Sequence, residues 1–364
     1  MISTLLTLLA TSLLSLTSAL AAHERSYFYV GGNYSLNSDG EHIFTDQMYV
    51  EKLVPAGGVS REYPIVFVHG NGQTGTNWLN KPDGGDGWAS YFLSQGYECY
   101  ILDQTSRGRS PWTPESGTRS VFTAEHIQEY FTAPERYNTW PQAHLHTQWP
   151  GSGVMGDPVF DAFYASNVPY VNVSTAQQSA VQDAGAQLLD RIGRKVILVG
   201  HSQGGTMSWV IADARPELIH SLVAIEPAGP PFRDVAFGNA PARAFALADI
   251  PVTYEPAVTD PESDFVYQTV QANSTDRFDC LTQAEHPQPR QLANISKFPV
   301  LLVTTEASYH AQYDWCTVLF LRQAGVKTEH WELAQLGIHG NGHMVFMEKD
   351  SDEVAQAIAG WLEH

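Results

Sequence analysis

Basic residues are scarce in this sequence. Its 364 residues include 20 Lys and Arg against 39 Asp and Glu, which gives a formal net charge of −19. Nucleic acids and anionic membrane surfaces attract proteins largely through Lys and Arg, so we expect neither as a partner. Charged residues make up 16% of the chain and apolar residues 43%, a composition that suits a globular protein able to bury a large core.

The motifs that commonly hold metals and phosphates are also missing. The sequence has no His-Glu-x-x-His motif, no closely spaced pair of cysteines of the kind that binds zinc, and no glycine-rich loop that ends in Lys. We therefore expect neither a metal nor an organic cofactor.

Cysteine is rare, with three residues in the whole chain. Cys99 lies in the strand-like segment YECYILD, where a buried and unreactive thiol is the usual outcome. Cys280 and Cys316 flank the apolar run FPVLLVTT, and in an oxidising compartment two such thiols can pair. We predict one disulfide, Cys280–Cys316, and a free Cys99.

A long apolar run occurs only at the N-terminus. Residues 1–21 are rich in Leu and end in small residues, which predicts a cleaved secretory signal peptide; a membrane anchor is the alternative. Residues 22–364 contain no segment long and apolar enough to cross a bilayer. We expect a secreted, extracellular protein, and such a chain meets the glycosylation machinery. The Asn-x-Ser/Thr acceptor sequences lie at Asn33, Asn172, Asn273 and Asn294.

Strand-like and helix-like segments alternate through residues 22–364. Several of the strand-like segments are continuous apolar runs, as expected for strands that are covered on both faces. The pattern predicts an α/β fold with a mostly parallel, doubly wound sheet, helices on both faces and an antiparallel pair at its start. The expected strands are residues 26–35, 47–55, 64–70, 99–104, 195–200, 221–227, 299–306 and 327–334. The expected helices are residues 87–96, 175–193, the segment after Ser202, 313–325 and 351–364.

Two long intervals break this alternation. Residues of about 111–172 combine many aromatic side chains with Pro and Gly, and residues of about 230–295 are Pro-rich and polar. Long irregular connections in a compact domain are commonly functional. We interpret both as lid insertions over the carboxyl edge of the sheet.

The segment Val196–Met207, VILVGHSQGGTM, places a Ser between glycines directly after a buried strand. The residues that follow predict a helix that ends near Pro216. A strand and a helix that meet almost without a loop force a sharp turn, and Gly200 and Gly204 avoid clashes on either side of Ser202. This G-x-S-x-G pattern indicates a serine nucleophile, with a plain glycine-rich turn as the alternative.

A serine hydroxyl needs a base and donors for the oxyanion that develops on its substrate. The glycine-rich loop LGIHGNGHMVFME offers His339 and His343, and we favour His343 because it leads directly into the final helix. The backbone N–H of Gln203, next to the nucleophile, is one expected oxyanion donor. The early segment HGNG supplies the second, for which we select the N–H of Asn71.

The acid that orients the base has three candidates. Glu226 ends the strand-like segment SLVAIEP, and Pro227 fixes the backbone there. Glu306 ends the next apolar segment, and Asp314 follows it. We favour Glu226, with Glu306 and Asp314 as alternatives.

The segments HGNGQTG, DQTSRGRS, GHSQGG, AIEPAG and GNGHMVFMEK occur in that order. Across about residues 60–364 the sequence resembles the α/β-hydrolase superfamily, and more closely a branch of secreted microbial serine carboxylesterases. The resemblance implies a triad whose acid is a Glu after the sixth strand, which is Glu226 here. Members of that branch can carry adjacent cysteines where this chain has Asn71 and Gly72, and a backbone donor does not depend on them.

These features predict a secreted serine hydrolase that cleaves small carboxylic esters, apolar or aromatic, through an acyl-enzyme. Ser202 attacks, His343 moves the proton, Glu226 orients His343, and water completes the cycle. A lactonase or a hydrolase of secondary metabolites would use the same residues. A binding module that has lost catalysis is the alternative from another class, and such modules typically lack the Ser or the His.

Overall fold

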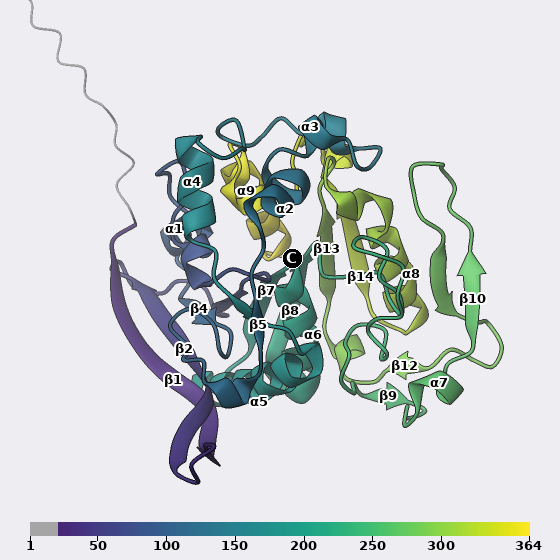
Figure 1. Cartoon of the computed structure of the whole chain (residues 1–364), viewed down its shortest axis with the longest axis horizontal. Coiled ribbons are helices and arrows are strands. Elements are labelled where there is room, and N and C mark those ends of the chain that lie inside the picture. The colour runs from purple at the N-terminus through teal and green to yellow at the C-terminus, as the bar shows by residue number, and fades with distance from the viewer. Residues whose placement is uncertain (1–20) are drawn as a thin grey trace, which may run out of the picture.

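The computed structural model describes residues 21–364, so the predicted signal peptide falls almost wholly outside the described part. One large sheet organises the chain (Figure 1). Its strand order is β1-β2-β4-β3-β7-β8-β13-β14, with β1–β2 and β2–β4 antiparallel and the remaining neighbours parallel. The strands are β1 (His23–Leu36), β2 (His42–Pro55), β3 (Ile65–Val68), β4 (Cys99–Asp103), β7 (Val196–His201), β8 (Ile219–Ile225), β13 (Val300–Thr304) and β14 (Thr328–Glu332). The predicted α/β fold, with its mostly parallel sheet and opening antiparallel pair, is confirmed.

Helices cover both faces of this sheet. They are α1 (Trp88–Ser94), α5 (Ser174–Ile192), α6 (Gln203–Ala214), α8 (Asp314–Gln323) and α9 (Ser351–Trp361). Side chains of β7 alternate between two apolar cores, as the pleat of a strand requires. Val196 and Leu198 pack in the core that includes α5, α6 and α8, whereas Ile197 and Val199 pack in the core with α1 and α9. This explains why the central strands read as unbroken apolar runs.

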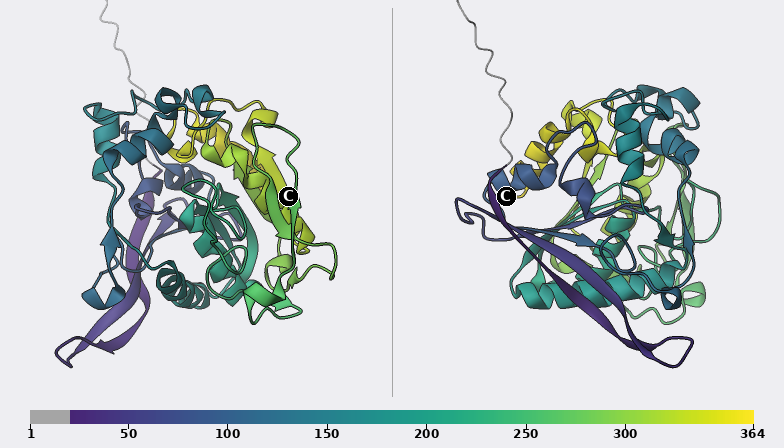
Figure 2. Two further views of the ribbon diagram at one scale, coloured as in Figure 1. Left: turned by 45° about the vertical axis from the view of Figure 1, so that its right-hand side comes forward. Right: turned by 60° about the vertical axis from the view of Figure 1, so that its left-hand side comes forward.

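The hairpin of β1 and β2 forms one edge of the sheet and projects beyond the body of the molecule as a twisted ribbon (Figure 2). Within residues 21–364, no helix has the length and apolar character that a bilayer crossing demands.

The interval 111–172 consists of short elements. These are α2 (Ala124–Ile127), α3 (Pro134–Tyr137), α4 (Pro158–Ala165) and the strand pair β5 (Arg119–Ser120) and β6 (Tyr170–Val171), with several single helical turns. Its aromatic side chains Trp140, Trp149, Phe160 and Phe163 are buried in the same core as α1 and α9. These side chains of the interval therefore contribute to the core of the domain, and Phe122 and Phe131 also line the pocket described below.

The interval 230–295 divides into two parts. Its first residues reach the pocket, and the remainder packs beside α6 and α8, where Phe245, Phe265 and Leu292 join the core. The elements of that remainder are β9 (Tyr254–Glu255), α7 (Pro261–Asp264), β10 (Tyr267–Val270), β11 (Cys280–Gln283) and β12 (Gln291–Leu292).

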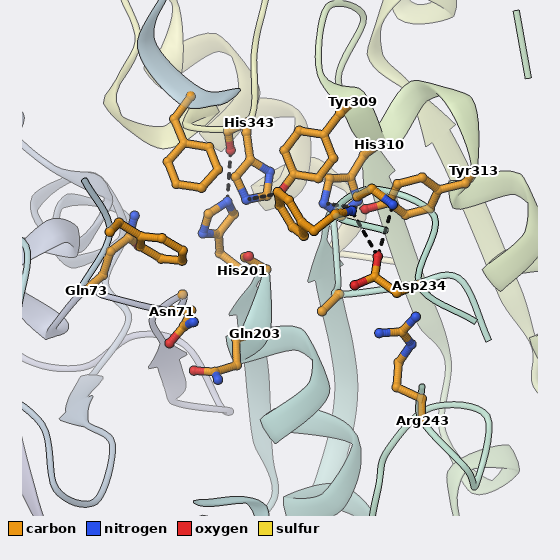
Figure 3. A pocket seen from close by; sticks show the side chains of 18 residues that line it. Asn71, Gln73, His201, Gln203, Asp234, Arg243, Tyr309, His310, Tyr313 and His343 are labelled. Atoms are coloured by element: carbon orange, nitrogen blue, oxygen red, sulfur yellow. Dashed lines mark hydrogen bonds between the residues drawn. The ribbon is translucent and has the colours of Figure 1, made fainter. Parts of the chain in front are cut away.

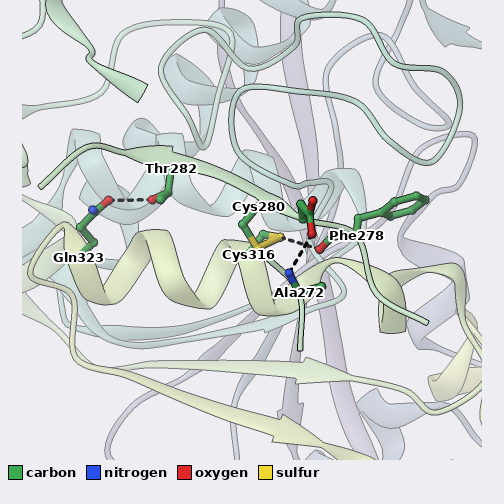
Figure 4. The surroundings of a disulfide bond; sticks show 7 residues. Ala272, Phe278, Cys280, Thr282, Cys316 and Gln323 are labelled. Carbon is green, nitrogen blue, oxygen red and sulfur yellow. Dashed lines mark hydrogen bonds between the residues drawn. A yellow bond between two sulfur atoms is a disulfide. The ribbon is translucent and has the colours of Figure 1, made fainter. Parts of the chain in front are cut away.

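The structure contains a Cys280–Cys316 disulfide, which links β11 to α8 (Figure 4). The Thr282 hydroxyl also donates to Oε1 of Gln323 at 2.7 Å and so ties the same two elements together. Cys99 is free and buried in β4, and burial raises the pKa of its thiol. Of the four glycosylation acceptors, Asn33, Asn172 and Asn273 are exposed; Asn294 is half-buried.

Candidate active site

Ser202 lies at the turn between β7 and α6. Its backbone has φ 55° and ψ −125°, a left-handed conformation that is uncommon for a non-glycine residue. A Cβ atom at Gly204 would lie 2.2 Å from the Val68 carbonyl oxygen, and one at Gly200 would lie 2.5 Å from the Gly204 carbonyl oxygen. Both positions flanking the serine therefore exclude any larger residue, as a tight strand-to-helix turn demands.

Glu226 and His343 form a buried pair. Glu226 follows β8, and its Oε2 lies 2.7 Å from Nδ1 of His343. Oε2 also accepts a bond from the Ser308 hydroxyl at 2.8 Å, and Oε1 accepts from the backbone N–H and the hydroxyl of Thr305, at 2.8 and 2.6 Å. These donors fix the carboxylate and offset the cost of burying it. Thr305 and Ser308 follow β13, so two neighbouring strands build the anchor for one imidazole.

The other two acid candidates have different partners. Glu306 lies 3.1 Å from Nδ1 of His339 and accepts the backbone N–H of Gly340 at 2.8 Å. Asp314 lies 2.9 Å from Nδ1 of His310. Of the three carboxylates, Glu226 is the one that the structure brings to His343.

His343 is held from several sides (Figure 3). Its ring stacks on His310, with 4.8 Å between centroids and 7° between planes, and its carbonyl oxygen lies 2.9 Å from Nε2 of His201. Burial, together with the neighbouring His310, lowers the pKa of His343 well below its ordinary value. The ring is therefore neutral near pH 7. In the described part of the chain, Nε2 contacts the Tyr309 hydroxyl at 3.3 Å and makes no hydrogen bond to Ser202.

The expected oxyanion donors flank the same pocket. Asn71 and Gln203 both line it together with Ser202 and His343. Among residues 21–364, neither the Asn71 nor the Gln203 backbone N–H has a hydrogen-bond acceptor. Two uncommitted donors beside a serine hydroxyl are what an oxyanion requires.

The pocket has a volume of about 180 Å³. Phe122, Phe131 and Phe237 contribute aromatic rings to its lining. Asp234 and Arg243 add a polar side (Figure 3). Both long intervals thus contribute to the pocket, although their role as lids remains a prediction.

Sequence reasoning missed Tyr309, His310 and Tyr313, which also line the pocket. They lie shortly after β13 in the segment EASYHAQYDW, whose carboxylates Glu306 and Asp314 were the only side chains there that the sequence marked as candidates. Because the carboxyl ends of parallel strands meet at one edge of a sheet, the position of this segment was the available signal.

Glu226, His310 and His343 also form a cluster of metal-ligand types, with one ligand atom of each within 4.8 Å of the others. However, His310 has both ring nitrogens engaged, Nδ1 by Asp314 at 2.9 Å and Nε2 by the Tyr313 hydroxyl at 3.1 Å. Hydrogen bonding already accounts for the arrangement of these side chains.

The chain belongs to the α/β-hydrolase family. The sequence model of that family matches residues 65–357, which include the serine turn, Glu226 and His343. This match agrees with the sheet order and with the position of Ser202 after the fifth strand of the main sheet.

Two known proteins illustrate the similarity. The chain is 43% identical to "probable secreted lipase phiG" of Fungal sp. (strain ATCC 74256), over 99% of this chain and 98% of that protein. A solved structure described as a novel bacterial esterase aligns with a TM-score of 0.59 and 21% identity, covering 93% of this chain and 95% of that one. The second similarity supports the fold.

Proposed function

We propose that the protein is a secreted serine hydrolase that cleaves carboxylic esters through an acyl-enzyme. The observation that carries this proposal is the 2.7 Å contact between Glu226 and His343 beside a pocket that Ser202 also lines. The relative named a probable secreted lipase, similar over nearly its whole length, supports ester hydrolysis and secretion. The Cys280–Cys316 disulfide suits the oxidising compartments through which secreted proteins pass.

The proposed mechanism follows from the hydrogen bonds of His343. A neutral imidazole that donates its Nδ1 proton to Glu226 leaves Nε2 unprotonated, so Nε2 is the atom that takes a proton. A rotation of the Ser202 hydroxyl toward Nε2 prepares it for attack on the ester carbonyl. The oxyanion is then stabilised by the N–H groups of Asn71 and Gln203, and His343 returns the proton to the departing alcohol. Water releases the acyl group by the same route in reverse order.

The pocket favours compact apolar or aromatic substrates. Its volume of about 180 Å³ is small, and three Phe side chains contribute aromatic rings to its lining. We expect short-chain and aryl esters to react faster than long-chain triglycerides. A lactonase would use the same residues, so a panel of p-nitrophenyl, aryl, lactone and triglyceride substrates separates these activities.

Replacing the nucleophile gives the largest expected loss of activity. Ser202→Ala should lower kcat for an activated ester by several orders of magnitude, because the covalent step is lost, while the melting temperature stays near that of the parent. It should also abolish labelling by a fluorophosphonate probe. Ser263→Ala, the same change at an exposed position, is the matched control. Activity of Ser202→Ala within tenfold of the parent would exclude the mechanism, and a folded parent that the probe does not label would favour a binding module.

A further inference from the structure

Arg107 is a buried cation that the proposed mechanism has not used. It lies after β4 in the segment DQTSRGRS and is 2% exposed. Among residues 21–364 no carboxylate lies within 4.0 Å of its guanidinium, whereas Arg109, two residues later, pairs with both Asp103 and Glu51. A buried charge is costly unless other groups compensate it, so an unpaired guanidinium at this position requires an explanation.

The two hydrogen bonds of the Arg107 guanidinium supply that explanation. Nη1 of Arg107 donates to the Gly70 carbonyl at 3.1 Å, and Nη2 donates to Oε1 of Gln203 at 3.0 Å. Gly70 and Gln203 belong to the two segments that carry the expected oxyanion donors. One guanidinium therefore bridges the loop after β3 and the first residue of α6.

The bond to Gly70 acts on the neighbouring N–H through the peptide plane. The Gly70–Asn71 peptide is trans, so its C=O and N–H groups point in opposite directions. A cation bound to the carbonyl oxygen helps to fix this plane, together with Nδ1 of His69 at 2.9 Å from the same oxygen, and the Asn71 N–H is then directed to the opposite side. It also draws electron density from the amide, which makes that N–H a stronger donor because hydrogen bonds in a chain polarise one another.

We propose that Arg107 is the positioning residue of the oxyanion site: its guanidinium aligns and strengthens the Asn71 N–H through the Gly70 carbonyl and locks Gln203 at the start of α6. This inference rests on the proposed ester hydrolysis and adds the group that organises its oxyanion donors. Arg107 does not touch the reacting atoms. Its effect must therefore appear in the transition state rather than in substrate binding.

Arg107→Gln and Arg107→Lys test this role, with Arg109→Gln as the matched control from the same loop. Removal of one oxyanion donor lowers kcat by about 10² to 10³. Removal of the guanidinium that positions such a donor should therefore lower kcat by about 10 to 10², with KM within threefold. Arg107→Lys should recover only part of kcat, because an ammonium group cannot donate in the planar fork of a guanidinium. Arg109→Gln should lower the melting temperature and leave kcat within threefold.

A tetrahedral inhibitor gives a readout that a purely structural role would not change. A trifluoromethyl ketone forms an oxyanion on Ser202, so its affinity for Arg107→Gln should fall by about the same factor as kcat/KM. If Arg107→Gln and Arg107→Lys keep kcat and ketone affinity within threefold of the parent, the proposal is wrong. If neither variant folds, the role of Arg107 is structural and the proposal is likewise rejected. A folded parent that hydrolyses no ester and reacts with no fluorophosphonate contradicts the proposed function itself, which distinguishes the two failures.

Discussion

Two of the buried His–carboxylate pairs in the described part of this protein lie close together and differ in charge. His343 contacts Glu226 and His146 contacts Glu348, each at 2.7 Å, and both histidine side chains are 1% exposed while both carboxylates are fully buried. The first pair faces the pocket. The second supports the loop that carries the first, because Glu348 also accepts the backbone N–H of Gly342 at 3.0 Å.

The two imidazoles differ in charge because their second ring nitrogens have different partners. In His343 it contacts the Tyr309 hydroxyl, and burial lowers the pKa of the ring. In His146 it lies 3.1 Å from Glu135. Burial alone would lower the pKa of His146, but Glu348 and Glu135 outweigh it and raise the pKa to about 9. A buried His–Glu pair thus holds a neutral imidazole when one carboxylate is present and a charged imidazole when two are present.

Within this comparison, the largest expected effect is the difference in catalytic activity between variants of the two carboxylates. Glu226→Gln should lower kcat for an activated ester by about 10³ to 10⁴, because the charge that orients and stabilises the imidazolium of His343 is lost. The matched change Glu348→Gln should leave kcat of the folded protein within tenfold. The comparison fails if the two variants lose activity to the same extent.

The free energy of unfolding should be sensitive to the Glu348 substitution, which is expected to have little effect on kcat. Glu348→Gln leaves the buried His146 with one carboxylate and weakens the support of the His343 loop, so the free energy of unfolding should fall by about 3 kcal/mol. Urea unfolding at pH 7 measures it. A loss below about 1 kcal/mol would mean that this pair contributes little to holding the loop.

The charge of His146 predicts an alkaline limit. Its pKa is raised in the folded state, so its contribution is fully present below pH 6.5, the ordinary pKa of His, and is lost as pH rises through about 9. At 1.36 kcal/mol per pKa unit the full contribution is roughly 3 kcal/mol. We expect His146→Gln to be less stable than the parent at pH 6 and similar to it above pH 10. A stability difference that does not change with pH would show that His146 is neutral in the folded protein.

The smallest effect should come from Glu306→Gln. Glu306 contacts His339, whose side chain is 62% exposed, and the backbone of Gly340. We expect kcat within threefold of the parent. A loss of 10³ or more here, with Glu226→Gln near the parent, would move the acid to the strand after β8 and overturn the assignment of Glu226.

The central sheet could be predicted because short local patterns in the sequence specify its strands and the helices between them. Each parallel strand is an apolar run that is buried on both faces, and the alternation with helices fixes the class of sheet. The glycines at positions 200 and 204 are equally informative, since a Cβ atom at either would overlap the backbone or a side chain. The packing of the two long intervals was harder to predict. The spacing of their aromatic side chains does not distinguish a segment that covers the pocket from one that belongs to the core. Side chains from the later part of the interval of about 230–295 join the core, and the role of that interval as a lid stays a prediction.

Among site residues, Ser202 and His343 could be selected from the sequence because each lies in a glycine-rich segment at a strand end. Glu226 was selected by its strand end and by resemblance. The sequence alone determined the fold and the types of residue at the carboxyl edge of the sheet. Only the tertiary structure decided which carboxylate meets which imidazole, that His310 stacks on His343, and that Arg107 bridges Gly70 and Gln203. Among these partners, Glu226 and His343 lie 117 residues apart in the chain, and charge state depends on partners and burial that no local pattern encodes.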